Sequence, residues 1–205
     1  MPLDDVEIGE VLEVANRLDL RETGGAHNQK GVDFQRYWAL MRIFQIEGSG
    51  QGDFLFLFEA IQDVAEFDSS ISPTMVTVYQ VKKKDRGEWE WGGLTNLPSP
   101  KKKTRKPVSA KKLAKAKASP IGNLYATVIA FSNVESRGHF ISNAGCDLPL
   151  LGGGSAATSA PCSLASLDSA YQELLKAGLE TVHKAGMPAP DLGRLRVERV
   201  KWGQA

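Results

Sequence analysis

The sequence predicts an α/β protein with a mixed β-sheet flanked by helices. Apolar residues recur at helical spacing over about residues 31–46, and three segments with strand character follow between residues 54 and 82. Helical spacing returns at about 122–131, before another short strand at 139–144. An order of helix, three strands, helix and strand is typical of an α/β core with both parallel and antiparallel pairing.

Two helices are expected before the strands. Residues 4–20 form the first, and the paired glycines in residues 21–28 indicate a turn. The second, over about residues 31–46, has a broad apolar face suited to packing on a sheet, and we expect Trp38 to lie in the core. The residues of this face are Phe34, Tyr37, Trp38, Leu40, Met41 and Phe44.

The strands differ in how clearly they are marked. Residues 54–59 form a nearly continuous apolar run, which is typical of a strand covered on both faces, and residues 63–67 suggest a second strand. Residues 75–82 are the clearest strand, because β-branched and aromatic residues dominate them. Residues 83–119 contain three prolines and many lysines, so we expect a basic loop there.

The chain of 205 residues is long enough for one domain with a full core. We expect residues 1–150 to form that domain, with a basic loop at 98–119. Residues 151–165 are rich in glycine, alanine and serine and indicate a linker. Residues 166–205 then form a C-terminal helix, over about 166–185, and a tail that either complete the domain or leave it.

Charge is distributed unevenly along the chain, although the net charge is only +1. Between Trp91 and Val134 there is no Asp or Glu, whereas nine Lys and Arg residues lie there. Such a segment attracts polyanions, and lysines that neutralise phosphates bind DNA without reading its sequence. The residues that we expect to contact nucleic acid are Lys83, Lys84, Lys101, Lys102, Lys103, Arg105 and Lys106.

Several classes of protein are disfavoured. No apolar run approaches the roughly 20 residues needed to span a bilayer, and the acidic N-terminus does not resemble a signal peptide, so we expect a cytoplasmic protein without a membrane partner. Cys146 and Cys162 lack the spacing of a zinc site and are too few for a disulfide framework. The three histidines share no ligand spacing either.

One group of polar residues suggests chemistry. Gln80 and Lys82 project from the same face of their strand, roughly 6.5 Å apart along the backbone. If the strand at 63–67 pairs beside it, Asp63 joins them. A carboxylate and an amide oxygen are hard ligands suited to Mg²⁺, and a neighbouring ammonium can stabilise charge on a phosphate. A solvated lysine at a strand end is the simpler interpretation of Lys82 taken alone.

The chain resembles the double-strand DNA endonuclease domain of bacterial antiphage effectors of the CBASS type, where that domain usually precedes a SAVED sensor domain. The resemblance covers about residues 21–145. Its motifs are RETGG (21–25), GVDFQRYWAL (31–40), FLFEAIQDV (56–64), YQVK (79–82), a tryptophan at 89 or 91, SPIGNLY (119–125) and FISNA (140–144). The resemblance implies the PD-(D/E)XK superfamily and its restriction-endonuclease-like αβββαβ core.

Residue roles follow from the resemblance by position. Asp63 matches the metal-binding aspartate, Gln80 stands where many relatives have glutamate, and Lys82 matches the motif lysine. The carbonyl of Val81 and the carboxylate of Glu59 are further candidate metal ligands. Because glutamine replaces the acidic residue and the literal PD dipeptide is absent, we expect weak affinity for the metal.

Two further positions are left open. Gln35 matches an amide or carboxylate at the edge of such sites, or is an ordinary helix-surface amide. Asp68 competes with Asp63 as the main metal ligand.

The function expected is a Mg²⁺-dependent (or Mn²⁺-dependent) endonuclease that cleaves double-stranded DNA with little sequence specificity in antiphage defence. Control by homo-oligomerisation, or by a fused or associated sensor domain, is implied by the same resemblance. Two alternatives stay open: a non-catalytic DNA-binding module of the same fold, and a nuclease acting on RNA or single strands.

Overall fold

The structure of the chain is a computed structural model. It describes residues 4–17, 20, 29–100, 107–158, 161–183 and 186–200. The glycine-containing turn expected at 21–28 and the five basic residues at positions 101–106 lie outside the described residues.

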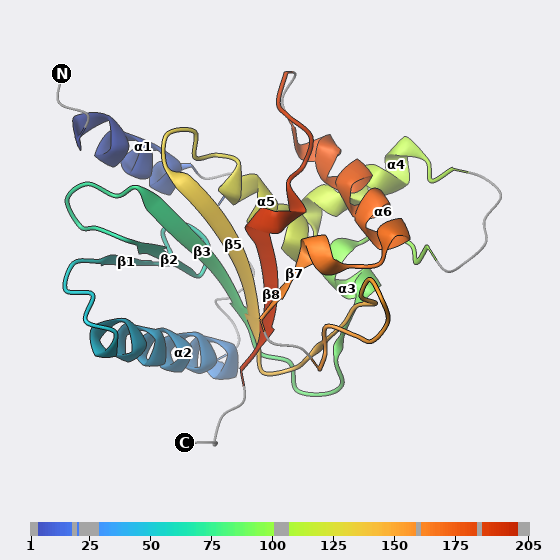
Figure 1. Cartoon of the computed structure of the whole chain (residues 1–205), viewed down its shortest axis with the longest axis horizontal. Coiled ribbons are helices and arrows are strands. Elements are labelled where there is room, and N and C mark those ends of the chain that lie inside the picture. Colours follow the sequence, from blue (N-terminus) through green and yellow to red (C-terminus); the bar gives the residue numbers. More distant parts are fainter. Residues whose placement is uncertain are drawn as a thin grey trace.

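A six-stranded mixed sheet forms the centre of the molecule (Figure 1). Its strand order is β1-β2-β3-β5-β8-β7, with β3, β5 and β8 parallel and the other neighbours antiparallel. The strands are β1 (Leu55–Phe58), β2 (Val64–Phe67), β3 (Met75–Lys82), β5 (Glu135–Ser142), β7 (Cys162–Ser163) and β8 (Leu195–Arg199). A separate parallel pair joins β4 (Trp89–Glu90) to β6 (Cys146–Asp147). This confirms the mixed sheet and is consistent with a restriction-endonuclease-like fold.

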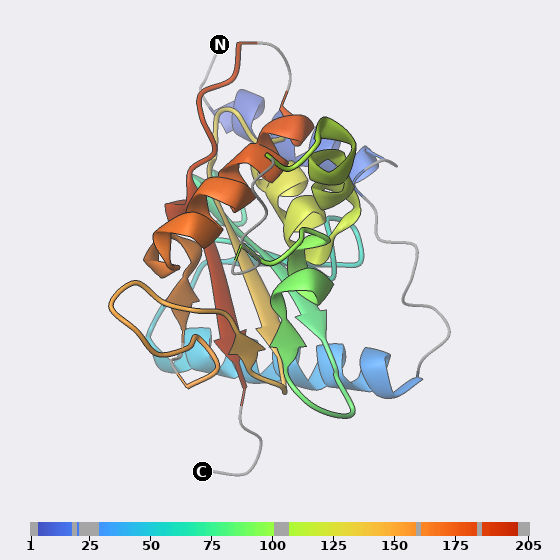
Figure 2. The ribbon, with the colours of Figure 1, turned by 90° about the vertical axis from the view of Figure 1, so that its right-hand side faces the viewer.

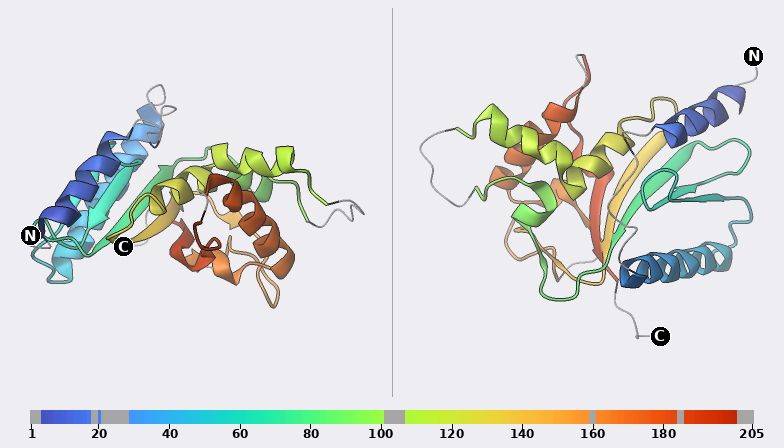
Figure 3. Two further views of the ribbon diagram at one scale, coloured as in Figure 1. Left: turned by 90° about the horizontal axis from the view of Figure 1, so that it is seen from above. Right: turned by 180° about the vertical axis from the view of Figure 1, so that it is seen from behind.

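Helices lie against the sheet on both sides. They are α1 (Asp4–Asn16), α2 (Gln29–Gly48), α3 (Trp91–Thr95), α4 (Ala110–Leu113), α5 (Pro120–Val128) and α6 (Ser169–Leu179), with short 3-10 turns η2 (Ala114–Ala118), η3 (Leu164–Ser166), η4 (Glu180–Val182) and η5 (Leu192–Arg194). The larger hydrophobic core joins α1, α5 and α6 to one face of the sheet. From behind, α1 and α5 cover this face (Figure 3).

The opposite face carries a smaller core beneath α2. Phe34 and Trp38 of α2 pack there on Tyr79 and Ile141 of the sheet. Trp38 is therefore a core residue, as the sequence predicts. Seen from the side, α2 runs across the lower ends of the strands (Figure 2).

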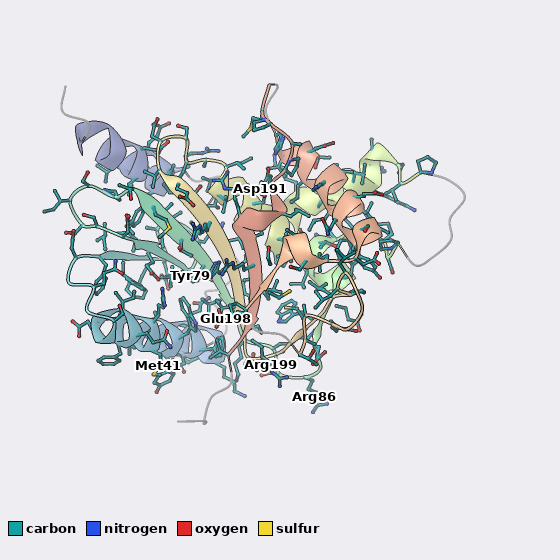
Figure 4. The ribbon with its side chains drawn as sticks, in the orientation of Figure 1. Met41, Tyr79, Arg86, Asp191, Glu198 and Arg199 are labelled. Carbon is teal, nitrogen blue, oxygen red and sulfur yellow. The ribbon has the colours of Figure 1, made fainter. Side chains whose placement is uncertain are left out.

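The expected apolar face of α2 is only partly buried, which corrects the prediction from periodicity. Tyr37, Leu40, Met41 and Phe44 are each more than half exposed. A helix on a sheet contacts it through one arc only, and residues 37, 40, 41 and 44 lie on the arc that faces away. Figure 4 shows Met41 on the side of α2 away from the sheet.

Residues 83–119 are not a simple loop, contrary to expectation. They include β4, α3, α4 and η2, with Trp91, Leu94 and Ala116 buried. These elements have two to five residues each, too few for a period to show in the sequence. Ala116 approaches α6 so closely that a Cβ at Gly178 would lie 2.9 Å from its side chain, which explains the glycine at that position.

The C-terminal part of the chain continues the same sheet. After a turn bridged between Pro149 and Ser155, β7 and β8 pair with each other, and β8 lies beside β5. Strand β5 also begins at Glu135, four residues earlier than its apolar end at 139–144 suggests. Alternating charged residues conceal β8 and the start of β5 in the sequence.

A buried carboxylate ties α1 to the segment between α5 and β5. Glu10 accepts hydrogen bonds from the backbone N–H and hydroxyl of Ser132 (2.6 and 2.7 Å) and from the N–H of Val134 (3.1 Å). Burial raises the pKa of Glu10, but these hydrogen bonds together outweigh it, and the net pKa lies below its ordinary value.

The structure also bears on membrane-spanning helices and on the two cysteines. Across the described residues, no helix combines the length and the apolar character needed to cross a membrane. Cys146 and Cys162 are free and buried, and burial raises the pKa of the Cys146 thiol to about 12. The two cysteines thus behave as core residues.

Candidate active site

The pairing of β2 with β3 brings the predicted residues together. Val64 is paired with Tyr79, so Asp63, one residue before β2, lies beside Gln80. Side chains alternate along a strand, which places Gln80 and Lys82 on the same face as Val78, the face of the larger core. Gln80 is 1% exposed and Lys82 lies at the open end of the strand.

Asp63 caps the end of β3 with its carboxylate. Its Oδ2 accepts a hydrogen bond of 2.7 Å from the N–H of Val81 and lies 3.5 Å from the Nζ of Lys82. Strand β2 begins only at Val64, so its backbone does not pair with the peptide groups of Val81. The side chain of Asp63 provides a hydrogen bond there in place of a strand backbone. The carboxylate is 10% exposed and the Lys82 side chain 20%, so the pair is largely shielded from water yet reachable from outside.

Gln35 completes this arrangement from α2. Its Nε2 donates to the carbonyl of Val81 at 3.2 Å. The amide therefore contacts the strand that carries Gln80 and Lys82, and Gln35 is more than a helix-surface residue.

The turn before Asp63 is held tightly in place. Glu59 and Gln62 both have left-handed backbone conformations, with φ of 55° and 59°. The buried amide of Gln62 donates to the carbonyl of Leu20 and to the hydroxyl of Thr127 on α5. Glu59 donates its N–H to the carbonyl of Asp63 at 3.1 Å, while its side chain is exposed. This turn fixes the position of Asp63.

The other wall of the site comes from β5 and β4. Ser142 is paired with Lys82 across the two parallel strands and accepts a hydrogen bond of 2.8 Å from the indole of Trp89. The same indole packs edge-to-face on Phe140 at 5.2 Å. Trp89 thus fastens the segment after β3 to the sheet.

The comparisons with known proteins decide the family. The model of the Cap4 double-strand DNA endonuclease domain matches residues 23–189. The chain belongs to this family of Cap4 nuclease domains. Searches of curated proteins and of solved structures found no significant match. The chain is accordingly identified as a DNA endonuclease domain by its sequence family and by a fold consistent with that family.

Sequence reasoning overlooked the role of one residue in the motif at 140–144. Asn143 accepts from the N–H of Lys84 (2.7 Å) and donates to the carbonyl of Lys84 (2.8 Å). The amide thereby holds the chain two residues beyond Lys82, as a neighbouring strand would. A polar residue directly after a buried strand was the only available signal.

Asp68, the other candidate metal ligand, lies away from Lys82. Its carboxylate accepts from the N–H and hydroxyl of Thr74 (2.9 and 2.6 Å) and from the N–H of Met75 (2.9 Å). It stabilises the turn between β2 and β3, at the end of the sheet opposite Lys82.

The basic residues that the sequence predicts to contact nucleic acid have different neighbours in the structure. Lys83 forms an ion pair of 3.5 Å with Asp85. The ammonium of Lys84 contacts the carbonyl of Glu88 and lies 4.8 Å from the ring centre of Trp89. Lys101, Lys102, Lys103, Arg105 and Lys106 lie outside the described residues. Arg86 and Arg199 are exposed toward the same end of the molecule (Figure 4).

A second polar cluster lies on the other face of the sheet. Arg42 binds the carboxylate of Glu66 through two hydrogen bonds of 2.8 Å, and the hydroxyl of Tyr79 donates to the same carboxylate. Burial, reinforced by the charges of Arg196 and Arg42, lowers the pKa of the neighbouring His139 to about 4. This cluster anchors α2 to the sheet and is separated by the sheet from Asp63 and Lys82.

Proposed function

We propose that the chain is a metal-dependent endonuclease that cleaves double-stranded DNA with little sequence preference, as an effector in defence against phage. The observation that supports this most directly is the meeting of Asp63 with β3, 2.7 Å from the N–H of Val81 and 3.5 Å from the ammonium of Lys82. Membership of the Cap4 endonuclease family supports the choice of DNA as substrate.

The oxygen donors at this site fit Mg²⁺ or Mn²⁺. The carboxylate of Asp63 lies directly before β2, the amide oxygen of Gln80 and the carbonyl of Val81 belong to the adjacent β3, and the exposed carboxylate of Glu59 belongs to the turn before Asp63. Within the described residues, no cluster of three or more His, Cys, Asp or Glu side chains could hold a metal ion. A donor set with one firmly placed carboxylate suits Mg²⁺, which keeps several waters, and predicts weak binding.

When bound, the metal would neutralise charge on the scissile phosphate and lower the pKa of a water molecule. Lys82 supplies a positive charge for the negative charge that develops on the phosphate. Asp63 orients Lys82 through their ion pair, and Asp63 and Gln35 together hold the two peptide groups on either side of Val81 in place. These groups are arranged before the substrate arrives, so little reorganisation accompanies the reaction.

The proposed low specificity follows from the basic residues. Lysines that contact phosphates contribute affinity without distinguishing bases, and their binding weakens steeply with salt. Lys83 flanks the site directly, and the basic residues at 101–106 extend the predicted contact. A plasmid, a linear duplex of unrelated sequence and a random duplex are accordingly expected to be cut at similar rates.

The deciding experiment compares Lys82→Ala with Lys176→Ala, an exposed lysine on α6 far along the chain. We expect Lys82→Ala to lose Mg²⁺-dependent plasmid cleavage by at least about 100-fold while duplex binding survives, since removing one charge-stabilising group typically costs that much. Lys176→Ala is expected to behave as the parent chain.

Unchanged cleavage by Lys82→Ala would reject the assignment. Duplex binding without cleavage by the parent chain, in either Mg²⁺ or Mn²⁺, would favour the non-catalytic DNA-binding module. Cleavage confined to RNA or single strands, assayed side by side, would replace duplex DNA as the substrate.

A further inference from the structure

Gln62, the residue directly before Asp63, has two features that are unfavourable for folding. Its backbone φ is 59°, in the left-handed region that residues with a Cβ rarely adopt. Its side chain is buried, and within the described residues its Oε1 has no hydrogen-bond partner. Left-handed conformations of this kind and unpaired buried polar atoms are uncommon in folded chains, and they gather at functional sites. Their coincidence at position 62 points to a role beyond packing.

The nitrogen of the same amide is bonded twice. Nε2 donates to the carbonyl of Leu20 at 3.1 Å and to the hydroxyl of Thr127, on α5, at 2.9 Å. That hydroxyl donates its own hydrogen to the carbonyl of Asn123, one helical turn earlier, at 3.1 Å. Because a carbonyl only accepts, the direction of each bond in this chain is determined, and the amide is held in one orientation. Thr127 is 0% exposed, so bulk water does not compete for these bonds.

We propose that Gln62 and Thr127 are positioning residues for the nuclease site, with Thr127 acting on Asp63 through the Gln62 amide. The inference rests on the proposed function for its link to cleavage. Residues 59–63 form a short turn, which is closed by the bond from the Glu59 N–H to the Asp63 carbonyl. Within so short a turn, a displacement of Gln62 also displaces its neighbour Asp63.

Helix α5 is a suitable reference for this position, because it packs on the strand that carries the partners of Asp63. The helix contacts β3 and β5 on the face of the sheet that is seen from behind (Figure 3). The Asp63 carboxylate lies 2.7 Å from the Val81 N–H and 3.5 Å from the Lys82 ammonium, both on β3. The bonds through Thr127 and Gln62 therefore join both sides of this contact to one helix. A misplacement of about 1 Å at a reacting group can slow a reaction about 100-fold.

The test removes the hydroxyl of Thr127 while it keeps the shape of the side chain. In the whole chain, Thr127→Val leaves the Gln62 amide without this acceptor, whereas Thr127→Ser keeps the hydroxyl. Thr95→Val is the matched control. Thr95 is 2% exposed, donates to the carbonyl of Trp91 at 2.7 Å and accepts from the N–H of Leu97 at 3.2 Å, so it also has one donated and one accepted bond. The two valine variants should therefore lower the melting temperature by similar amounts.

One measurement follows Asp63 directly and needs neither metal nor DNA. The Val81 N–H is bonded to the Asp63 carboxylate, so its hydrogen exchange, measured by NMR on the metal-free chain, reports whether the carboxylate is in place. We expect this exchange to be at least about tenfold faster in Thr127→Val than in Thr95→Val, and close to that of the parent chain in Thr127→Ser. In Mg²⁺, kcat for plasmid cleavage should fall about tenfold or more in Thr127→Val, while KM changes less than about twofold.

Gln62→Met tests the same bond from its other end, because methionine keeps the length of the side chain but cannot donate a hydrogen bond. It should reproduce the faster Val81 exchange, and the double variant with Thr127→Val should add little to the larger single effect. The inference would be overturned by Val81 exchange at the rate of the Thr95→Val control and, in a parent chain that cleaves DNA, by cleavage at the control's rate. If the parent chain does not cleave DNA, the proposed function fails, and the exchange rates alone still test whether Thr127 positions Asp63.

Discussion

Replacing Asp63 by asparagine or by alanine separates its two tasks. Asparagine keeps an oxygen that can accept the 2.7 Å hydrogen bond from the Val81 N–H, but it removes the negative charge facing Lys82. Alanine removes both the acceptor and the charge. The pair of variants therefore distinguishes the capping of β3 from the chemistry of the site.

The magnitudes follow from these contacts. A hydrogen bond to a charged group contributes about 1.5–3 kcal/mol to the free energy of unfolding, and the partly exposed ion pair with Lys82 adds at most about 1 kcal/mol. Asp63→Ala should thus lose about 2–4 kcal/mol, and Asp63→Asn about 1 kcal/mol, since a neutral hydrogen bond remains. For a chain of this size, the melting temperature should fall by about 5–12 °C for alanine and about 2–4 °C for asparagine.

Activity should not follow stability. If Asp63 is the principal carboxylate of the site, both variants should lose Mg²⁺-dependent cleavage of plasmid DNA by at least about 100-fold. Thermal melts and cleavage assays on the same samples, at a temperature where both variants are folded, provide the measurements. Cleavage by Asp63→Asn within a few-fold of the parent chain would refute the role of the carboxylate, and equal destabilisation by the two variants would refute the capping of Val81.

Three further outcomes are expected. Glu10→Gln should lower stability at pH 7 by about 1–2 kcal/mol and make stability less dependent on pH in acid. The pKa of Glu10 is lowered in the folded chain, so its stabilising contribution is complete above the ordinary pKa of 4.5 and is lost as the pH falls below that value. Melts between pH 7 and 3 in which the variant loses stability as steeply as the parent chain would contradict this. Gln80→Glu should destabilise the metal-free chain, since it buries a carboxylate, yet reduce the Mg²⁺ concentration for half-maximal cleavage several-fold; an unchanged metal requirement would argue against Gln80 as a ligand. Trp89→Phe removes the hydrogen bond to Ser142 but keeps the aromatic ring, so a loss of about 1 kcal/mol with a measurable drop in cleavage is expected, and stability equal to the parent would show that the bond is dispensable.

The central part of the fold could be predicted because its composition is distinctive. β-branched and aromatic residues dominate 75–82, and the structure places β3 on those residues. Strand β8 escaped prediction for the opposite reason. Arg196, Glu198 and Arg199 alternate with Leu195 and Val197 in a segment with the composition of a surface tail, and only pairing with β5 makes it a strand. Short elements such as α3 and α4 have no period of their own.

The sequence by itself determined the chemical types at the site: one carboxylate, one amide and one ammonium, with Gln80 and Lys82 fixed on one face by the alternation of a strand. Tertiary structure decided which aspartate joins them. Asp63 and Asp68 bracket the same short strand, and nothing local distinguishes them. The antiparallel register sets Asp63 beside Gln80 and leaves Asp68 to the turn. The exposure of Leu40, Met41 and Phe44 on α2 was likewise decided by tertiary structure, because the helical period shows that residues share a face but not whether another element covers that face.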